Sequence, residues 1–110
     1  MDVYTIYADP IEGTNPYEFI EKMNVFLDKL VEMDKMVSSR ILRSKLGFRS
    51  MDLPEFRIDM EFKNLQQLDD AMTGIIRNEK SVDKDHVAFN QLVDVETIQH
   101  FLYRDWPDEL

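Results

Sequence analysis

The sequence predicts an α+β domain in which helices pack on one face of a four-stranded antiparallel sheet, with an extra short helix before the last strand. Segments of alternating or β-branched apolar residues are interspersed with segments whose apolar residues recur every three or four positions, in the order βαββα(α)β. The first strand and helix repeat the plan of the second strand–helix pair, as in the split-βαβ arrangement. We expect residues 1–110 to form one domain of this kind.

The first strand and the first helix are predicted from the opening third of the chain. Asp2–Ala8 is short and carries apolar residues on both faces, which is typical of a central strand. After a loop, a helix begins at a clear signal: Asn15 can cap it, Pro16 suits the first helical position, and Glu18 has capping-box spacing. The apolar stripe of this helix predicts an end near Asp34.

The middle of the chain predicts two strands. Met36–Leu46 alternates and contains β-branched residues, and it lies within Lys35–Ser50, which has no acidic residue. We favour an edge strand whose cations guard against aggregation, while an anion or acidic partner is the alternative. Glu55–Lys63 is the cleanest strand, with apolar residues on one face and charges on the other. The charged face is formed by Arg57, Asp59 and Glu61.

The second half closes the sheet. Asn64–Asn78 predicts a helix, with Asn64 and Gln67 in capping-box positions, and Lys80–Asn90 predicts a shorter third helix. Asp94–Arg104 predicts the fourth strand. The resulting topology is βαββαβ and ferredoxin-like, with the short helix as an addition.

Such a sheet leaves one face without helices. On the first strand that face would carry either Val3, Thr5 and Tyr7 or the alternate set, Tyr4, Ile6 and Ala8, and the sequence leaves this choice open. Both sets are too apolar for a solvated surface, so a second copy of the chain is expected to cover it. A homodimer is therefore predicted.

Composition excludes several classes of partner. The net charge of -9 is spread over the chain, which disfavours nucleic acids and anionic membranes because both need a cationic surface. The acids in the third strand also argue against an RNA-recognition domain. The chain has no cysteine and no apolar run of about 18 residues, and its first residues lack a basic region followed by an apolar one, so we expect a cytoplasmic protein without nucleic-acid or membrane partners.

His86 is the candidate for chemistry. It shares an apolar helical stripe with Phe89, and an imidazole titrates close to neutral pH, so it can act as acid, base or ligand. The alternative, which we favour, is a core histidine whose nitrogens bond a carbonyl or carboxylate. Asn90 follows one turn later as a neighbour or hydrogen-bond donor. No HxxxH or HxH pair accompanies His86, so no metal site is predicted.

The charged row of the third strand also has two interpretations. Arg57, Asp59 and Glu61 form either a polar pocket of paired carboxylates beside a guanidinium or a structural row, with ion pairs to Arg43 or Lys45 on the neighbouring strand or exposure to solvent. We favour the structural row.

The chain resembles a known family at its third helix and its end. The topology, the residues Asp85, His86, Phe89 and Asn90, and the ending FLYRDWPD are similar to the dimeric α/β-barrel superfamily. Within it they resemble an uncharacterised bacterial family near the stress-responsive barrel and antibiotic-biosynthesis-monooxygenase-like proteins. The resemblance implies two sheets packed open face to open face, with Arg57, Asp59 and Glu61 in the dimer interior.

The resemblance also implies a cleft between sheet and helices for a small hydrophobic or aromatic molecule. The residues expected there are His86 as the catalytic candidate and, for ligand binding, Asn90, Tyr4, Tyr7 and Phe89. Haem-degrading members carry an asparagine on the first strand and a tryptophan near the end of the second helix; this chain has neither, and its one tryptophan is Trp106. No cofactor is expected.

Two functions follow from these observations. The first is a homodimeric small-molecule-binding protein with a hydrophobic cleft. If Phe and Met side chains fill that cleft, the protein is a purely structural dimer. The second is a cofactor-independent monooxygenase- or isomerase-like enzyme acting on an aromatic or hydrophobic metabolite, with His86 as acid or base. An open cavity beside His86 favours a site, and a closed core favours a structural role.

Overall fold

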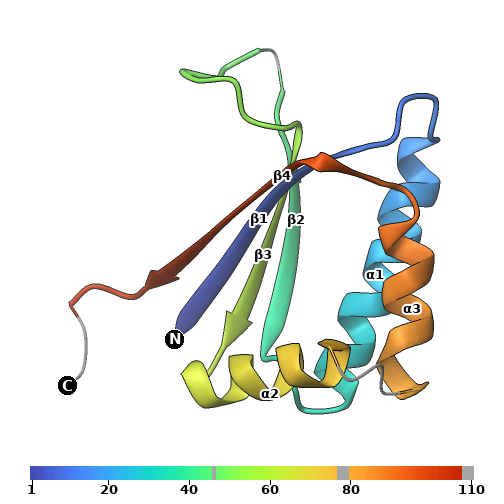
Figure 1. Ribbon diagram of the computed structural model, residues 1–110. Helices are drawn as coiled ribbons and strands as arrows, with labels where there is room; N and C mark the ends of the chain where they lie inside the picture. Colours follow the sequence, from blue (N-terminus) through green and yellow to red (C-terminus); the bar gives the residue numbers. More distant parts are fainter. Residues whose placement is uncertain (46, 77–79, 108–110) are drawn as a thin grey trace.

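The computed structural model describes residues 1–45, 47–76 and 80–107, and for 76 and 80–84 it describes the backbone alone. These residues form a four-stranded sheet and three helices, which confirms the predicted α+β class (Figure 1). The elements are β1 (Asp2–Pro10), α1 (Pro16–Glu32), β2 (Ser38–Arg43), β3 (Phe56–Phe62), α2 (Leu65–Ile76), α3 (Lys80–Asn90) and β4 (Val93–Arg104). No helix in the described ranges is long and apolar enough to span a membrane.

The sheet has the order β2-β3-β1-β4, and every neighbouring pair is antiparallel. The first strand is therefore central, and the strand rich in cations is an edge strand, as the sequence predicts. Helices α1 and α3 lie side by side along one face of the sheet, while α2 crosses near the ends of the strands (Figure 1).

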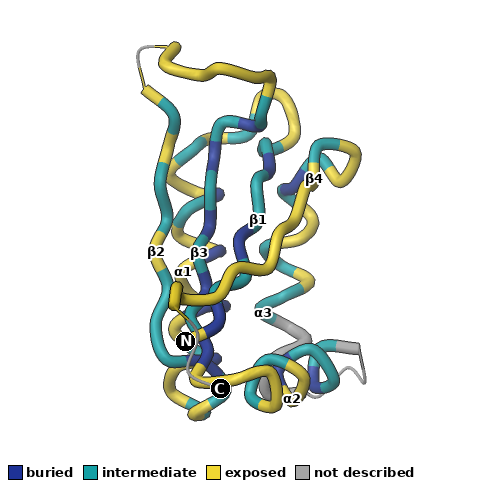
Figure 2. Tube along the Cα trace, turned by 90° about the vertical axis from the view of Figure 1, so that its left-hand side faces the viewer, coloured by how far each residue is buried: buried dark blue, intermediate teal, exposed yellow. Residues whose placement is uncertain are grey.

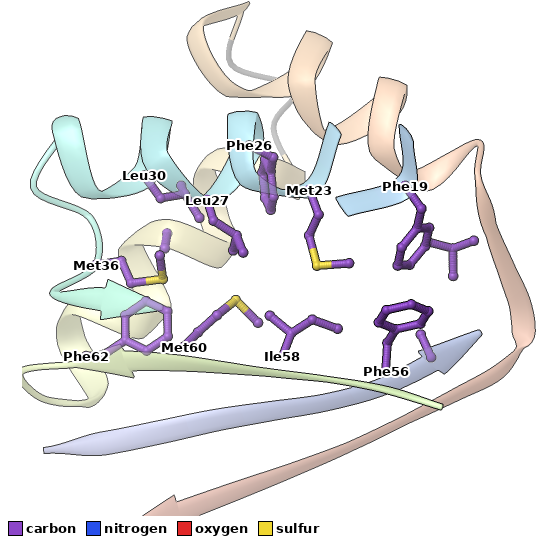
Figure 3. Packing of buried hydrophobic residues seen from close by; sticks show 13 residues of the cluster. Phe19, Met23, Phe26, Leu27, Leu30, Met36, Phe56, Ile58, Met60 and Phe62 are labelled. Carbon is purple, nitrogen blue, oxygen red and sulfur yellow. The ribbon is translucent and has the colours of Figure 1, made fainter. Parts of the chain in front are cut away.

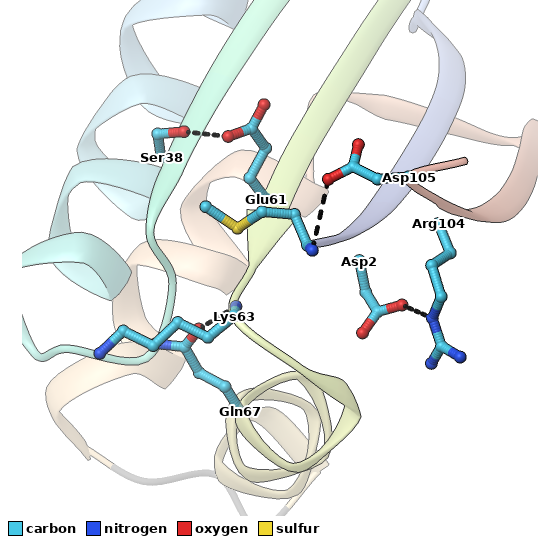
Figure 4. Close-up of polar contacts among 8 residues, drawn as sticks. Asp2, Ser38, Glu61, Lys63, Gln67, Arg104 and Asp105 are labelled. Atoms are coloured by element: carbon cyan, nitrogen blue, oxygen red, sulfur yellow. Dashed lines mark hydrogen bonds and ion pairs between the residues drawn. The ribbon is translucent and has the colours of Figure 1, made fainter. Parts of the chain in front are cut away.

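Both capping signals mark the starts of helices. Oδ1 of Asn15 accepts a hydrogen bond from the backbone N of Tyr17 at 2.9 Å, and α1 begins at Pro16. Oδ1 of Asn64 accepts from the backbone N of Gln67 at 2.9 Å. The side chain of Gln67 bonds the backbone N of Lys63 at 2.8 Å, one residue before the position reached in a standard capping box (Figure 4).

Several predicted bounds differ from the structure, in which β1 runs to Pro10 rather than to Ala8. The second strand is shorter than Met36–Leu46, because β2 pairs with β3 only over Ser38–Arg43. Leu46, at the predicted end of this strand, and Asn78, at the predicted end of the second helix, both lie outside the described residues.

The core lies between α1 and the inner strands. The stripe of α1 packs on the apolar side of β3, whose residues alternate between buried and half-buried along the strand (Figure 3). Burial of each large apolar side chain contributes about 1.5–3 kcal/mol to the free energy of folding. The side chains in this layer include Phe19, Met23, Phe26, Leu27 and Leu30 from α1, and Phe56, Ile58, Met60 and Phe62 from β3.

Strand register decides which face of β1 covers the core. Tyr4 pairs with Met60 and Ile6 pairs with Ile58, so this set points toward the helices. Val3, Thr5 and Tyr7 pair with Glu61, Asp59 and Arg57 and belong to the opposite face.

Charged residues on the opposite face are paired, although not with the partners that the sequence suggested. Nε of Arg57 lies 2.9 Å from Oδ1 of Asp59, and that carboxylate also accepts from the hydroxyl of Thr5 at 2.8 Å. Glu61 accepts from the hydroxyl of Ser38 at 3.0 Å (Figure 4). The predicted pairing with Arg43 is wrong, because Arg43 lies opposite Phe56 in the register and belongs to the other face.

Arg43 instead forms an ion pair with Glu55, with Nε and Oε1 3.0 Å apart. Lys45, the other partner suggested by the sequence, lies beyond the end of β2. The basic residue that does face the row is Arg40, which is directly opposite Asp59.

β4 is the most exposed strand of the sheet. Figure 2 shows it as an almost continuous exposed segment along one side. Large apolar side chains on it remain accessible, among them Val95, Phe101, Leu102 and Tyr103, with exposed fractions between 40% and 60%. The helix-free face and this edge together leave apolar surface uncovered in a single chain.

Candidate functional site

A cavity of about 260 Å³ lies between the helical layer and the sheet. Its sheet wall is formed by side chains of β1, β3 and β4, and its helical wall by side chains of α1, α2 and α3. The lining includes Tyr4, Ile6, Ala8, Met23, Phe26, Leu27, Leu30, Ile58, Met60, Met72, Ile75, His86, Phe89, Asn90, Val93 and Ile98. Packing of Phe and Met therefore does not fill the space between the two layers.

The polar groups of this wall are few. Among the described residues that line the cavity, Tyr4, His86 and Asn90 carry polar side chains, and the others are apolar. An apolar cavity with a small number of polar groups is typical of sites for small organic molecules, because apolar contact supplies affinity and the polar groups supply orientation.

α3 brings His86, Phe89 and Asn90 to the cavity together. The His86 ring is half-buried, and its centroid lies 5.2 Å from that of Phe26 at an interplanar angle of 55°. Phe89 stacks on the same Phe26 ring, with ring centroids 6.2 Å apart and an interplanar angle of 11°. The imidazole is thus held between a phenylalanine of α1 and the cavity, on the apolar stripe that the sequence indicates.

Tyr4 faces this group from β1. Its hydroxyl oxygen lies 2.8 Å from Nδ1 of His100 on the neighbouring strand β4, and the two rings meet edge to face at 6.0 Å. Burial raises the pKa of Tyr4 above that of an ordinary tyrosine, because desolvation penalises the phenolate. Tyr4 is therefore a neutral phenol at physiological pH.

Tyr7 does not line this cavity. It lies on the helix-free face, where its ring meets Phe101 edge to face at 6.0 Å and the guanidinium of Arg57 lies 5.9 Å from its centroid. The hydrogen bond to Asp59 raises the pKa of Arg57 above its ordinary value, so this cation stays charged. The two tyrosines that the sequence grouped together thus lie on opposite faces of the sheet.

His100 does not line the cavity, but it holds the hydroxyl of the lining residue Tyr4, and the sequence did not predict this contact. The strand β4 is exposed, and its mixture of polar and apolar residues does not indicate which position has a functional contact. Only the pairing of the strands identifies this contact: in the register of β1 with β4, His100 lies opposite Ile6, and Tyr4 lies one pair further along the same face.

Across the described residues, no group of three or more His, Asp or Glu side chains is arranged to hold a metal ion.

Comparison with known proteins identifies the family. A model described as a family of unknown function, DUF6614, matches residues 1–110. The chain belongs to the DUF6614 family. A search of curated proteins finds no match to this DUF6614 chain.

Solved structures show the fold of this DUF6614 protein. The protein At3g17210 from Arabidopsis thaliana matches with a TM-score of 0.76 at 12% identity, over 100% of both chains. A dimeric ferredoxin-like protein of unknown function from Jannaschia sp. CCS1 matches with a TM-score of 0.68 at 11% identity, over 94% of this chain and 98% of the other.

A third match is SnoaB, a cofactor-independent oxygenase from Streptomyces nogalater. The TM-score is 0.65 at 15% identity, over 97% of this chain and 98% of SnoaB. The resemblance indicated by the sequence is confirmed, because the neighbours include dimeric ferredoxin-like proteins and an oxygenase. At such identities the likeness establishes the ferredoxin-like fold, and a shared fold does not transfer a function.

Proposed function

We propose that this DUF6614 protein is a homodimeric small-molecule-binding protein whose cavity takes a hydrophobic, preferably aromatic, ligand. The observation that carries the proposal is the apolar cavity of about 260 Å³ with Tyr4, His86 and Asn90 in its wall. A protein cavity of about 150 Å³ holds benzene, so this one suits a ligand of about two rings.

The ligand would contact both layers of the domain. The aromatic rings of Phe26 and Phe89 offer edge or face contacts to a flat ligand, and the isoleucines of the sheet wall contact it from the other side. His86, Asn90 and Tyr4 would then orient polar substituents.

The homodimer is supported by what a single chain leaves uncovered. The helix-free face presents Tyr7 and the hydrogen-bonded charges of β3, and β4 adds exposed apolar side chains. A second copy placed over this face would bury apolar surface without stranding the carboxylate of Asp59, because Arg57 and Thr5 already satisfy it. Several structural neighbours are described as dimeric.

A cavity-filling variant tests the ligand proposal. Thermal unfolding of the wild type is measured with bicyclic aromatic probes such as 2-naphthol and indole, beside Ile6→Phe, which places a ring in the cavity. At 100 times its dissociation constant a ligand stabilises the fold by about 2.7 kcal/mol, which raises Tm by several degrees. We expect this rise in the wild type and its loss in Ile6→Phe.

Ile41→Phe is the matched control. Ile41, Ile58 and Ile6 lie in one row across the sheet, but Ile41 is not in the cavity wall. This variant should respond to the probes as the wild type does. The proposal fails if no probe stabilises the wild type, or if Ile6→Phe responds as strongly as the wild type.

A charge placed on the helix-free face tests the homodimer. Phe101→Glu puts a carboxylate beside Tyr7 on this face, and sedimentation equilibrium should show a dimer for the wild type and a monomer for the variant. Phe48→Glu, at a side chain 86% exposed in the loop between β2 and β3, should remain dimeric. A monomeric wild type at all concentrations contradicts the proposal.

A second candidate is a cofactor-independent oxygenase or isomerase acting in the same cavity with His86 as acid or base. It is favoured by the position of the imidazole in an apolar wall, where a bound ligand would displace water, and by the fold shared with the oxygenase SnoaB. Oxygen uptake and product mass are measured with dihydroxynaphthalenes, and His86→Gln should abolish turnover while the probes still bind. Absence of turnover by the wild type argues for the binding protein.

A further inference from the structure

The hydroxyl of Tyr4 and the imidazole of His100 form a polar pair at the edge of the apolar cavity. Resting on the proposed function, we propose that this pair is a hydrogen-bond acceptor that selects hydroxylated aromatic ligands, that is, phenols and naphthols. Tyr4 receives the ligand hydroxyl, and His100 is the positioning residue that sets the direction of the Tyr4 hydrogen.

The strand register holds the two rings in place. Tyr4 lies opposite Leu102 and Ile6 lies opposite His100, so Tyr4 and His100 are diagonal neighbours on the helix side of the sheet. Their rings meet edge to face at 82° with centroids 6.0 Å apart, and Oη and Nδ1 are separated by 2.8 Å. Residues 96 positions apart in sequence thus form one hydrogen-bonded unit.

We assign His100 the tautomer in which Nδ1 accepts and Nε2 carries the ring hydrogen. The His100 side chain is exposed, so Nε2 can present that hydrogen to water. The Tyr4 hydroxyl then donates its single hydrogen to Nδ1. Its oxygen keeps acceptor capacity and has no hydrogen left to donate, so a ligand must bring the donor.

The cavity wall around Tyr4 is apolar, and this strengthens the preference for hydroxylated ligands. The neighbours of Tyr4 on β1, Ile6 and Ala8, are apolar, and so are the residues of β3 that line the cavity. A ligand hydroxyl in apolar surroundings loses its hydrogen bonds to water and needs a protein partner. Among the described residues of the sheet wall, Tyr4 carries the one polar side chain, so we assign its oxygen as that partner.

A pair of isosteric ligands tests the assignment. Calorimetric titration compares 2-naphthol with 2-methylnaphthalene, in which a methyl group replaces the hydroxyl. The wild type should bind 2-naphthol about tenfold more tightly, as expected for one net hydrogen bond in an apolar site. Tyr4→Phe removes the hydroxyl and keeps the ring, so this preference should disappear while 2-methylnaphthalene binds as before.

His100→Leu separates this proposal from a simple requirement for a polar group. Without the imidazole the Tyr4 hydrogen is free to donate, so the variant should gain affinity for 2-naphthaldehyde, a carbonyl acceptor, relative to 2-naphthol. Tyr103→Phe is the control, since Tyr103 pairs with Val3 on the opposite face of the sheet, and it should leave all three affinities unchanged.

The outcomes distinguish failure of the proposed function from failure of the roles assigned to Tyr4 and His100. If neither naphthalene derivative binds the wild type, the proposed function fails. If both bind equally, or if Tyr4→Phe keeps the preference for 2-naphthol, the cavity binds ligands but the assignment of Tyr4 is overturned. An unchanged carbonyl preference in His100→Leu overturns the positioning role of His100.

Discussion

Asp2 and Arg104 join the first and last strands of the sheet near its edge. Nε of Arg104 lies 2.7 Å from Oδ1 of Asp2, and the aspartate side chain is only 6% exposed, whereas that of Arg104 is 49% exposed (Figure 4). The carboxylate therefore depends on a partner that reaches it from the neighbouring strand, because few waters can replace that partner.

Arg104→Met should lower the free energy of unfolding by about 1–3 kcal/mol, since it leaves a buried carboxylate with one hydrogen bond fewer. Urea denaturation measures the change. Lys63→Met is the control. Nζ of Lys63 lies 3.8 Å from Oδ1 of Asp34, and both side chains are largely exposed, so loss of this ion pair should lower the free energy of unfolding by less than about 1 kcal/mol. If the two substitutions lower the free energy of unfolding equally, burial of Asp2 does not increase its dependence on Arg104.

Phe19→Ala should be among the most damaging single changes in α1. Phe19 is fully buried, and its ring lies 5.2 Å from Phe56 and 5.7 Å from Phe89, so its removal opens a space between three elements. A loss of about 3–5 kcal/mol is expected by urea denaturation. Tyr17→Ala, two residues earlier at a side chain 87% exposed, should change stability by less than about 0.5 kcal/mol.

Ionisation of Tyr4 should weaken the fold at high pH. Burial raises the pKa of this phenol in the folded state, so as pH rises the unfolded chain loses the proton first. The unfolded state then binds fewer protons than the folded state, and stability falls between the unfolded and the folded pKa. Denaturation at pH 9 to about 11.5 should show a smaller fall for Tyr4→Phe than for the wild type. Equal slopes would contradict the raised pKa.

Asp34, which follows the C-cap residue Met33 of α1, has a left-handed backbone conformation with a φ of 58°. Glycine adopts this conformation without a steric penalty, so Asp34→Gly should be more stable than Asp34→Ala by about 1 kcal/mol in thermal unfolding. The hydrogen bond from the Gln67 side chain to the carbonyl of residue 34, at 3.1 Å, involves the backbone and is retained in both variants. If Asp34→Ala is the more stable variant, the strain argument is wrong.

Local signals predicted the elements of the fold well. Asn15 and Asn64 mark helix starts because a side-chain oxygen satisfies backbone N–H groups within the next three residues, an interaction that needs no distant partner. The alternation of β3 is also local, because one face is apolar and the other charged. Topology followed from the order of these elements.

The site depended on contacts that local patterns do not encode. Both faces of β1 are similarly apolar, so alternation gave no indication that Tyr4 faces the helices and Tyr7 the opposite side; pairing of Tyr4 with Met60 decides it. His86 and Phe89 could be placed on the cavity side because α3 has its own apolar stripe. His100 acquires its role only from the register between the first and last strands, at opposite ends of the chain.

The exposed edge at β4 has a consequence for handling the protein. A long strand with one unpaired edge and adjacent apolar side chains, here Phe101, Leu102 and Tyr103, is a template for unintended β-pairing between chains. Cations line the opposite edge at β2, where they oppose such pairing. Aggregation during expression or refolding should therefore begin at β4, and Leu102→Lys, on the face of β4 opposite to Phe101 and Tyr103, is the substitution most suited to prevent it.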